Sequence, residues 1–544
     1  MPTLIKGGRV IDPANRRDGV GDVWMQDGRI VAPQTRAPEN VHDARGKIVM
    51  AGAIDIHSHI AGGNVSTARL LLPEAHRAYL ARPAATPLAN AGFSTFETGR
   101  LYAQMGFSLV VEPAVAPHHA LHAHLELADI PIIDKAILTV LGNDDFLLGF
   151  LRDGDSPAAI RDYVAATLAA SKGLGIKVIN AGAAAAFKYN ARSFDLDDVV
   201  PHYGVSSRRI VEALQQAAID LGVPHPVHVH ANNLGLPGNV ATAKATILAA
   251  RGLPMHLAHL QFYAYGKEGP KGFSSAAAEL AEVVNAHKNV TVDVGQVMFQ
   301  PTVTVSSDVM RQYNGMGTAK PRKSVIFDGD SNGGGVVPFT YSNKSFFNAV
   351  QWACGLELFL AIDDPMRVFF TTDHPNGAPF TAYPDLFALL MSRDLRARWM
   401  ASLPKAAMEV TNLPAMTREY TLPEISVMTR QAPAKLLGLR DRGHLGPGAI
   451  ADVAVYDDLP DRAKMFRHAA LGFKDGELVV REGRVTHLRF GRALTLQPTP
   501  GKAMQQRLEA HYQSLYGLSH RRFAVRAEAL TRSSNPFEAI ACSR

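Results

Sequence analysis

The middle of the chain alternates short apolar runs with segments that have the pattern of helices. The runs span residues 47–57, 106–115, 135–143, 175–182, 225–233, 255–261, 290–297 and 367–375. Near-continuous apolar sequence is typical of parallel strands that are buried on both faces. Eight such strands form a (β/α)₈ barrel, and each run has a polar residue toward its C-terminal end, where such barrels carry their chemistry. The pattern therefore predicts an α/β protein with a TIM barrel over residues 51–440.

Both ends of the chain show the pattern of β-hairpins instead. Asp27-Gly28 lies between the alternating residues of 22–31, and this dipeptide strongly indicates a tight hairpin turn. Residues 443–457 and 473–486 again indicate strands joined by tight turns. We therefore expect a small β-sandwich domain assembled from residues 1–50 and 441–500, followed by a C-terminal extension over residues 501–544.

Two segments fit neither pattern. Residues 299–346 are polar and longer than a normal barrel connection, and long connections in compact domains are usually functional or disordered. We expect a lid or an intersubunit segment there. The tail at 521–532, RRFAVRAEALTR, is basic. It is either the solvated face of a helix or a docking surface for another protein of a complex, and the sequence does not decide between them.

Composition narrows the class of protein. Apolar residues make up 47% of the 544 residues and charged residues 19%, as in soluble globular proteins, and no run of eighteen apolar residues predicts a membrane span. The first residues lack the pattern of a signal peptide, and two cysteines are too few for a disulfide framework. We therefore expect a cytoplasmic protein. The net charge of +6 comes from scattered basic residues without a nucleic-acid motif, so we expect no nucleic-acid partner.

The first and last apolar runs carry the residues with the clearest chemistry. His57 and His59 are two apart on the first run, so both side chains point to the same side of a strand and can bind one metal ion. Asp373 ends the last run within Thr372-Asp373-His374-Pro375. A carboxylate there can bind the metal and accept a proton from bound water. This combination predicts a metal-dependent hydrolase, with a C–N bond as the expected target.

Two further histidines complete the predicted ligand set. On the fifth run, His230 is nearer the C-terminal end than His228, so we prefer His230 as a ligand and expect His228 to lie deeper. On the sixth run His259 is nearer the mouth than His256. Their spacing of three places them on opposite faces of a strand, so we expect only His259 to point inward.

Lys177 is the candidate bridge between two metal ions. It lies inside the apolar run Gly175-Ile176-Lys177-Val178, where a charged lysine is costly. Burial lowers the pKa of an amine, and a neutral amine reacts with carbon dioxide to give an anionic carbamate with two oxygens. The alternative is a lysine that reaches solvent from a strand end. Lys172 and Lys188 are weaker candidates because neither lies inside an apolar run.

Polar residues near the predicted metal site are candidates for contact with a substrate. Asn232 and Asn233 directly follow His230. His118, His119, His122 and His124 cluster after the second run. His119 or His122 is the candidate substrate contact from this group, with His119 preferred; the alternative is that these histidines are exposed polar residues without a role in binding.

Longer motifs resemble a known superfamily. DIHSH (55–59), HAN (230–232), TDHP (372–375) and the segment 429–457 resemble amidohydrolases of the dihydroorotase and hydantoinase branch. GAIDIHSHIAGGNV, HVHANNLGLPGN and QWACGLELFLAIDDPMRVFFTTDHPNGAPFTAYP resemble more closely the family that comprises the hydrolytic subunit of formylmethanofuran dehydrogenase and the alpha subunit of the bacterial formyltransferase/hydrolase complex. This second resemblance covers nearly the whole length.

The resemblance implies a particular reaction. It implies two Zn²⁺ ions that cleave the N-formyl group of a formylated methanofuran-type amine, giving formate in one-carbon metabolism, and three partner subunits. Carried over by position, the ligands are His57, His59, Lys177 as a carboxylysine, His230, His259 and Asp373. Asp373 is then also the catalytic acid and base.

Two other functions stay open from the sequence. The first is a cyclic-amide hydrolase of the hydantoinase or dihydropyrimidinase type, which opens a ring and releases no formate. The second is a metal-free scaffold subunit, for which we would expect several ligands to be missing. Every expected ligand type is present, which favours the enzymes.

Overall fold

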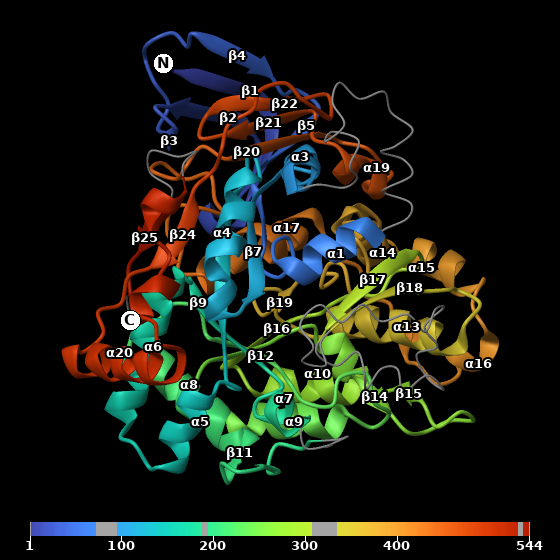
Figure 1. Cartoon of the computed structure of the whole chain (residues 1–544). Helices are drawn as coiled ribbons and strands as arrows, with labels where there is room; N and C mark the ends of the chain where they lie inside the picture. Colours follow the sequence, from blue (N-terminus) through green and yellow to red (C-terminus); the bar gives the residue numbers. More distant parts are fainter. Residues whose placement is uncertain (1, 72–94, 188–193, 307–334, 531–536, 543–544) are drawn as a thin grey trace.

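The computed structural model describes residues 2–71, 95–187, 194–306, 335–530 and 537–542 (Figure 1). Its central feature is a ring of parallel strands. In ring order the strands are β6 (Ala53–Asp55), β7 (Phe107–Val115), β8 (Asp134–Leu141), β9 (Gly175–Ile179), β12 (Val227–His230), β13 (Met255–Leu257), β16 (Val290–Asp293) and β19 (Val368–Phe369). Each coincides with one of the predicted apolar runs, apart from Asp134 at the start of β8, which lies one residue before its run, so the predicted barrel is confirmed.

The ring closes at the C-terminal ends of its first and last strands. Ser58 and His374 form a parallel bridge, and the His59 N–H donates to the His374 carbonyl over 2.9 Å. This closure brings the sequence around His57 beside Asp373, although more than three hundred residues separate them. Chemistry that the chain divides between its two ends is thereby assembled at one edge of the barrel.

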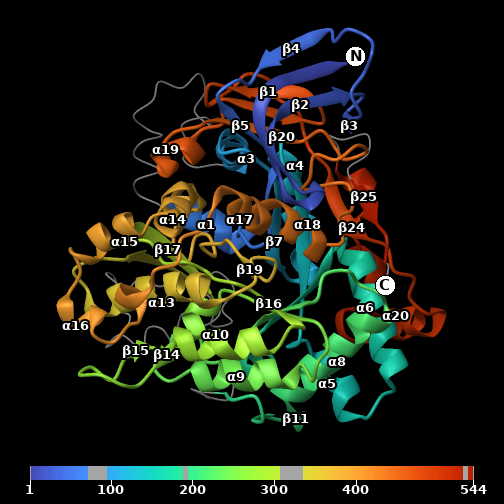
Figure 2. The same ribbon diagram turned by 180° about the vertical axis from the view of Figure 1, so that it is seen from behind.

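Helices cover the outside of the ring (Figures 1 and 2). The longer ones are α3 (Thr95–Gln104), α4 (Ala120–Asp129), α6 (Pro157–Ser171), α8 (Ser207–Asp220), α9 (Val240–Ala249), α10 (Ala277–Ala286), α13 (Phe346–Ala361) and α14 (Tyr383–Met391). The others are α1 (Gly63–Leu71), α5 (Asp145–Arg152), α7 (Ala183–Phe187), α15 (Arg393–Met400), α16 (Lys405–Met408), α17 (Leu422–Ser426), α18 (Ala432–Leu436) and α19 (Arg462–Arg467).

Local sequence starts these helices. Ser156 accepts from the Ala159 N–H at the start of α6, with a proline at the next position, and Ser206 accepts from the Arg209 N–H at the start of α8. Both are favoured caps, because a side-chain oxygen satisfies an N–H that has no partner in the helix. Buried apolar residues then recur at helical spacing, as at Ile210 and Leu214 in α8, and face the ring.

A second sheet joins the two ends of the chain. Its strands are β1 (Thr3–Asp12), β2 (Arg17–Gln26), β3 (Arg29–Val31), β4 (Asn40–Asp43), β5 (Lys47–Ala51), β20 (Val453–Asp457), β21 (Leu471–Lys474), β22 (Glu477–Arg481) and β23 (Arg484–Val485). Antiparallel pairing of β5 with β20 connects the halves. At its other side, the Ile30 N–H donates to the Ala449 carbonyl over 2.7 Å, and the enclosed side chains form a core separate from the barrel core.

The predicted hairpin turn at Asp27-Gly28 is present. Both residues have positive φ, 49° and 77°, and they join β2 to β3. A positive φ at both central residues is the geometry for which Asp-Gly is preferred, because it matches the twist of the flanking strands.

The first apolar run, 47–57, is two strands rather than one. β5 belongs to the terminal sheet and β6 to the barrel, and the chain changes partner at Gly52, whose N–H donates to the Asp452 carbonyl. A Cβ at Gly52 would lie 2.4 Å from the Ser108 Oγ, so the crossing requires a glycine. An unbroken apolar run gives no indication of such a change, because both strands are buried.

The C-terminal residues return to the barrel. β24 (Ala493–Leu496) pairs in parallel with the start of β8, and β25 (Phe537–Ile540) pairs with β24. Residues 493–496 were expected in the terminal sheet, and they extend the barrel sheet instead. Helix α20 (Lys502–Tyr516) lies between β24 and β25 in sequence and packs against α6.

The two remaining segments are partly described. Residues 301–306 (β17) and 335–340 (β18) form an antiparallel hairpin, and 307–334 lie outside the described residues. The basic tail contains two short 3₁₀ helices, η8 (His520–Phe523) and η9 (Ala527–Ala529), rather than one helix face, and its last two residues also lie outside the described ranges. Within the described part of the chain, no helix is both long and apolar enough to cross a membrane.

Candidate metal centre

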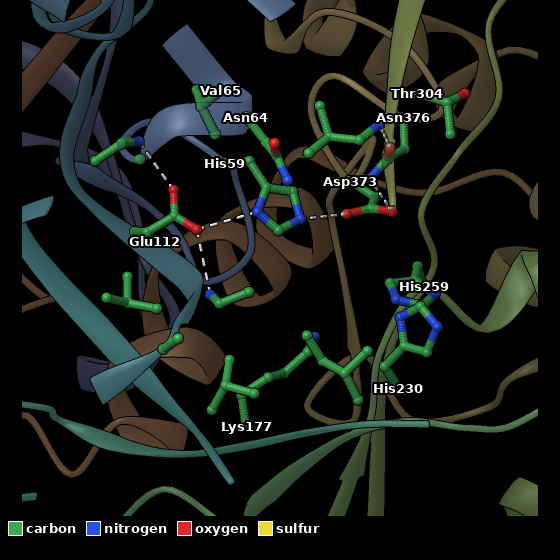
Figure 3. Close-up of a pocket in the computed structure, with 18 of the residues that line it drawn as sticks. His59, Asn64, Val65, Glu112, Lys177, His230, His259, Thr304, Asp373 and Asn376 are labelled. Atoms are coloured by element: carbon green, nitrogen blue, oxygen red, sulfur yellow. Dashed lines mark hydrogen bonds and ion pairs between the residues drawn. The ribbon is translucent and has the colours of Figure 1, made fainter. Parts of the chain in front are cut away.

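A cavity of about 270 Å³ opens at the C-terminal ends of the barrel strands. Five of the six predicted ligand residues line it (Figure 3). They are His59, Lys177, His230, His259 and Asp373. The sixth, His57, is fully buried directly beneath, with its Nε2 3.0 Å from Asp373 Oδ1. The structure thus brings together all the ligand residues that the sequence selected.

Asp373 is the point on which the histidines converge. Its Oδ1 lies 3.0 Å from His57 Nε2 and 3.3 Å from His59 Nε2. The rings of His57 and His259 are 5.3 Å apart, and those of His230 and His259 are 4.5 Å apart. One ligand atom each from His57, His259 and Asp373 lies within 4.8 Å of the others. Nitrogen and carboxylate oxygen donors in such a group suit Zn²⁺.

Several of these buried atoms form no hydrogen bond with the described residues. Lys177 Nζ and His259 Nδ1 have none, and His57 Nε2 and Asp373 Oδ1 lie 3.0 Å from each other without meeting the geometry of a hydrogen bond. A buried polar atom without a partner costs on the order of 1–3 kcal/mol, and folded proteins rarely retain several together. A bound cation would satisfy the lone pairs of the histidines and the carboxylate. The donor set therefore fits a metal centre.

Lys177 has the environment that carbamate formation requires. It is fully buried on β9, and burial lowers the pKa of its amine to about 8, although the carboxylates of Asp293, Asp373 and Glu112 oppose this shift. A substantial fraction of the amine is then neutral near physiological pH. Of the rival lysines, Lys172 ends helix α6 and Lys188 lies outside the described residues.

Glu112, on β7, holds His59 in place. Its Oε1 lies 3.0 Å from His59 Nδ1, and its Oε2 accepts the backbone N–H groups of Ile60 and Ala61. Burial opposes a charge on His59, but the carboxylates of Glu112 and Asp373 outweigh it and raise the His59 pKa to about 9. The pair directs His59 Nε2 toward Asp373.

Asp293, at the end of β16, holds His57 in the same way. Its Oδ2 lies 2.9 Å from His57 Nδ1, 3.0 Å from His256 Nε2 and 3.3 Å from His228 Nε2. Its Oδ1 accepts the His259 N–H. Burial favours the neutral carboxyl, yet the surrounding histidines keep the pKa of Asp293 well below its usual range. One carboxylate thus orients one predicted ligand and the backbone of a second predicted ligand.

Sequence reasoning missed both of these carboxylates. Glu112 is the one acidic residue within the apolar run FSLVVEPAV, and Asp293 closes the run VTVD. The signal in the sequence was an acidic residue inside or at the end of a buried strand. A buried carboxylate requires a hydrogen-bonding or charged partner, so each of these residues indicated a contact with the site. His228 was expected to lie deeper than His230, and its contacts with Asp293 and His57 agree with that expectation.

The expectation for His256 was wrong. The His256 ring contacts Asp293 inside the barrel, and the His259 ring also faces inward, 5.3 Å from the ring of His57 and on the wall of the cavity. β13 ends at Leu257, and His259 adopts a left-handed backbone with φ of 33°, so strand alternation stops before it reaches His259. His259 does lie at the mouth of the barrel, as predicted. The argument from a spacing of three residues on a strand, however, does not apply to it.

Of the three predicted substrate contacts, one lines the cavity and two do not. His119 lines the cavity and is exposed. Asn232 and Asn233 do not line it: the Asn232 amide donates to Ser207, and the Asn233 amide donates to Asp195 and Thr242. The loop turns away after His230, with φ of 65° at Asn233. The cavity wall is supplied instead by segments without a strand pattern, with Asn64, Thr304, Tyr341 and Asn376 among its polar residues.

This arrangement defines a class of protein. Residues 40–487 match the model of the Amidohydrolase family, and the chain belongs to that family. Membership makes the protein a metal-dependent hydrolase, and the predicted ligand set lies at the barrel mouth, where such a site is expected.

The chain is similar to particular members throughout its length. It is 50% identical to the FhcA protein of the formyltransferase/hydrolase complex of Methylorubrum extorquens, with 100% of each chain covered. It is 38% identical to the FwdA protein of Methanocaldococcus jannaschii, with 92% of each covered. The crystal structure of the formyltransferase/hydrolase complex FhcABCD from Methylorubrum extorquens with methylofuran contains a chain that superposes with a TM-score of 0.94, at 50% identity and full coverage of both chains.

Proposed function

We propose that this protein hydrolyses the N-formyl amide of a methylofuran-type cofactor to formate and the free amine. It would act as the hydrolytic subunit of a cytoplasmic formyltransferase/hydrolase complex, with three other subunits, in one-carbon metabolism. The observation that carries this proposal is the full-length 50% identity to the FhcA protein of such a complex, whose crystal structure contains methylofuran. The cavity and its donor atoms support a hydrolytic role for this chain.

The donor set divides into two metal positions. His57, His59 and Asp373 would hold one Zn²⁺ ion, and His230 and His259 the other. Lys177, carboxylated on Nζ, would bridge them. When bound, the two ions would supply a water that is acidic enough to act as a nucleophile near neutral pH, and would polarise the formyl oxygen. The neutral Lys177 amine favoured by burial supports the carboxylation.

Asp373 moves the proton in this reaction. Its Oδ2 is held by the Asn376 amide over 2.9 Å, which leaves Oδ1 facing the cavity and the histidines. Oδ1 takes a proton from the attacking water and passes it to the amide nitrogen. A C–O bond forms at the formyl carbon, the C–N bond breaks, and formate and the free amine leave.

The cavity wall suits a flat, largely apolar substrate body. Val115, Ile179, Leu234 and Phe262 line it together with the polar donors. A furan ring next to an amide has this division, with an apolar face and one hydrogen-bonding group, and ligand sites typically combine apolar walls with a few convergent polar groups.

Formate release tests the proposal against the nearest rival. The protein, purified with the subunits that accompany it, is incubated with zinc and a formylated furfurylamine-type substrate, and formate and free amine are measured. The same sample is offered hydantoin and dihydrouracil. We expect formate and amine in equal amounts and no ring opening. Ring opening without formate release would instead identify a cyclic-amide hydrolase.

A further inference from the structure

The β17–β18 hairpin is attached to the turn that follows the last barrel strand. The Val305 N–H on β17 donates to Asn376 Oδ1 over 2.6 Å, and the Thr302 hydroxyl donates to the Pro375 carbonyl. Both contacts come from β17 and reach consecutive residues of the turn. The hairpin is therefore bound to the barrel at Pro375 and Asn376, two and three residues after Asp373.

The amide nitrogen of the Asn376 side chain contacts Asp373. Its Nδ2 donates to Asp373 Oδ2 over 2.9 Å, while its Oδ1 accepts from Val305. The side chain is buried, and so is its bond to Asp373, whereas the bond from Val305 is partly buried. A carboxylate held through one oxygen cannot rotate freely, and here Oδ1 is the oxygen left facing His57 and His59. Figure 3 shows Asn376 next to Asp373, across the cavity from Lys177.

The hairpin also packs against the start of the barrel. Val303 and Val336 form a small apolar cluster with Ala68 of helix α1. α1 begins at Gly63, shortly after the His57–His59 strand end. The hairpin is thus in contact with the segments that follow both the first and the last strand, at the place where the ring closes.

We propose that Asn376 is a positioning residue that couples the position of the β17–β18 hairpin on the barrel to the orientation of the Asp373 carboxylate. The inference rests on the proposed function in assigning the proton transfer to Asp373. A seated hairpin holds Asn376 Oδ1, which turns Nδ2 toward Asp373 Oδ2 and leaves Oδ1 aimed at the metal position. A displaced hairpin frees the amide, and Asp373 loses that restraint. Coupling of this kind is reciprocal, so metal bound at Asp373 stabilises the hairpin seat.

This coupling can be measured without any substrate, by the rate of backbone hydrogen exchange in the peptide that covers residues 301–306. In the wild type, zinc loading of the metal-free protein should slow exchange of this peptide. In Asn376→Ala the zinc-dependent slowing should be lost. Asn348→Ala is the matched control: Asn348 is also buried and accepts a backbone N–H, from Ser342, and its amide donates to Gln351 rather than to Asp373. It should retain the zinc effect.

Kinetics separate positioning from a merely structural role. Asn376→Ala should lower kcat by ~100-fold at saturating zinc, the order expected from small misplacement of a reacting group, with KM within about twofold. Val305→Pro removes the N–H that holds Asn376 while leaving the asparagine in place, and should reproduce the loss of kcat. The double variant should be no worse than either single variant, because both break one linkage.

Three outcomes would overturn the inference. They are a zinc effect on residues 301–306 that survives in Asn376→Ala, additive losses in the double variant, and a normal kcat in Val305→Pro. If Asn376→Ala fails to fold, Asn376→Asp, which keeps an acceptor for Val305, should keep the hairpin protected and still lose kcat; normal kcat there would overturn the inference as well. Failure of the wild type to release formate would contradict the proposed function alone, since the exchange experiment uses only zinc.

Discussion

At the scale of single residues, each histidine of the His57–His59 pair has its own carboxylate. Asp293 lies against Nδ1 of His57, and Glu112 lies against Nδ1 of His59. A carboxylate at Nδ1 fixes the ring orientation and leaves Nε2 available as a ligand, which is why such partners strengthen metal sites. Both Nε2 atoms then point at the same oxygen of Asp373. Spacing along the strand brings the histidines to one face, and the carboxylates fix their direction.

Replacing Asp293 should weaken zinc binding. Asp293→Asn keeps the size of the side chain but removes the charge that His57, His228 and His256 share. We expect the dissociation constant for zinc to rise ~10–100-fold, as for other partners of metal-binding histidines. Competition with a zinc-chelating dye measures it. An unchanged dissociation constant would show that the histidines are oriented without Asp293.

Asp373→Asn should remove turnover without unfolding the protein. The amide cannot accept the proton, so kcat should fall by ~10²–10⁴-fold, the usual contribution of a general acid or base. The measurement is formate release at saturating zinc, with thermal unfolding recorded in parallel. Asp363→Asn, at an exposed carboxylate just before β19, should behave as the wild type. Near-normal kcat in Asp373→Asn would contradict the proton-transfer role.

At the scale of the elements, helix α4 contains a buried histidine that should make the fold sensitive to acid. His124 Nε2 lies 3.0 Å from the Ser171 carbonyl, its ring contacts Phe537 of β25, and burial lowers its pKa to about 4. The folded state therefore binds this proton less readily than the unfolded state, where the pKa is about 6.5. Stability from His124 is present above that unfolded-state pKa and is lost as the pH falls through the folded-state value.

The loss should reach about 3 kcal/mol at low pH, from the size of the pKa difference. His124→Gln should lack this component, so the gap in unfolding midpoint between the wild type and the variant should shrink or reverse between about pH 6.5 and pH 4. The control His122→Gln, at an exposed position of the same helix, should follow the wild type. Parallel pH curves for wild type and His124→Gln would contradict the prediction.

The strands of the barrel were predictable from the sequence, and their boundaries were less so. Eight apolar runs gave eight strands because parallel strands buried on both faces have nowhere to place polar residues except at their ends. The same property conceals changes of partner, as at Gly52, where one run serves two sheets. Strand spacing also fails past the last paired residue, as for His259 after β13.

The site was predictable where its residues come from strands. His57, His59, Lys177, His230, His259 and Asp373 lie on or shortly after strands, and they converge. Asn232 and Asn233 were expected in the cavity because they follow His230, but the loop turns their amides toward other partners. Asn376 and Thr304 contribute to the cavity through a turn and an inserted hairpin. No periodicity relates such segments to the barrel, so only the fold reveals their place.

At the scale of the whole molecule, a buried ionic network joins the barrel to the terminal sheet. Lys474 on β21 lies 3.0 Å from Asp134 of β8 and 2.7 Å from Asp452, and both carboxylates are buried. Arg442 also contacts Asp134, and it reaches Glu538 of β25 over 2.8 Å. The network therefore connects three parts of the chain: the first half of the barrel, the terminal sheet and the C-terminal extension.

Removing Lys474 should destabilise the protein strongly. Lys474→Met leaves Asp452 buried without its partner, which typically costs about 3–5 kcal/mol. The midpoint of urea unfolding should fall accordingly. Lys405→Met is the control, because the exposed pair with Glu409 contributes about 0–1 kcal/mol at most. Equal midpoints for the two variants would show that the network adds no stability.

Zinc stoichiometry read together with formate release tests the central claim most directly. The protein with its accompanying subunits is stripped of metal, titrated with zinc in the presence of bicarbonate, and assayed at each step on a formylated furfurylamine-type substrate. The account predicts that formate release reaches its maximum at about two zinc ions per chain, as a dinuclear site requires. It also predicts that Lys177→Met neither retains two ions nor releases formate. Full formate release without bound metal, or from Lys177→Met, would contradict it.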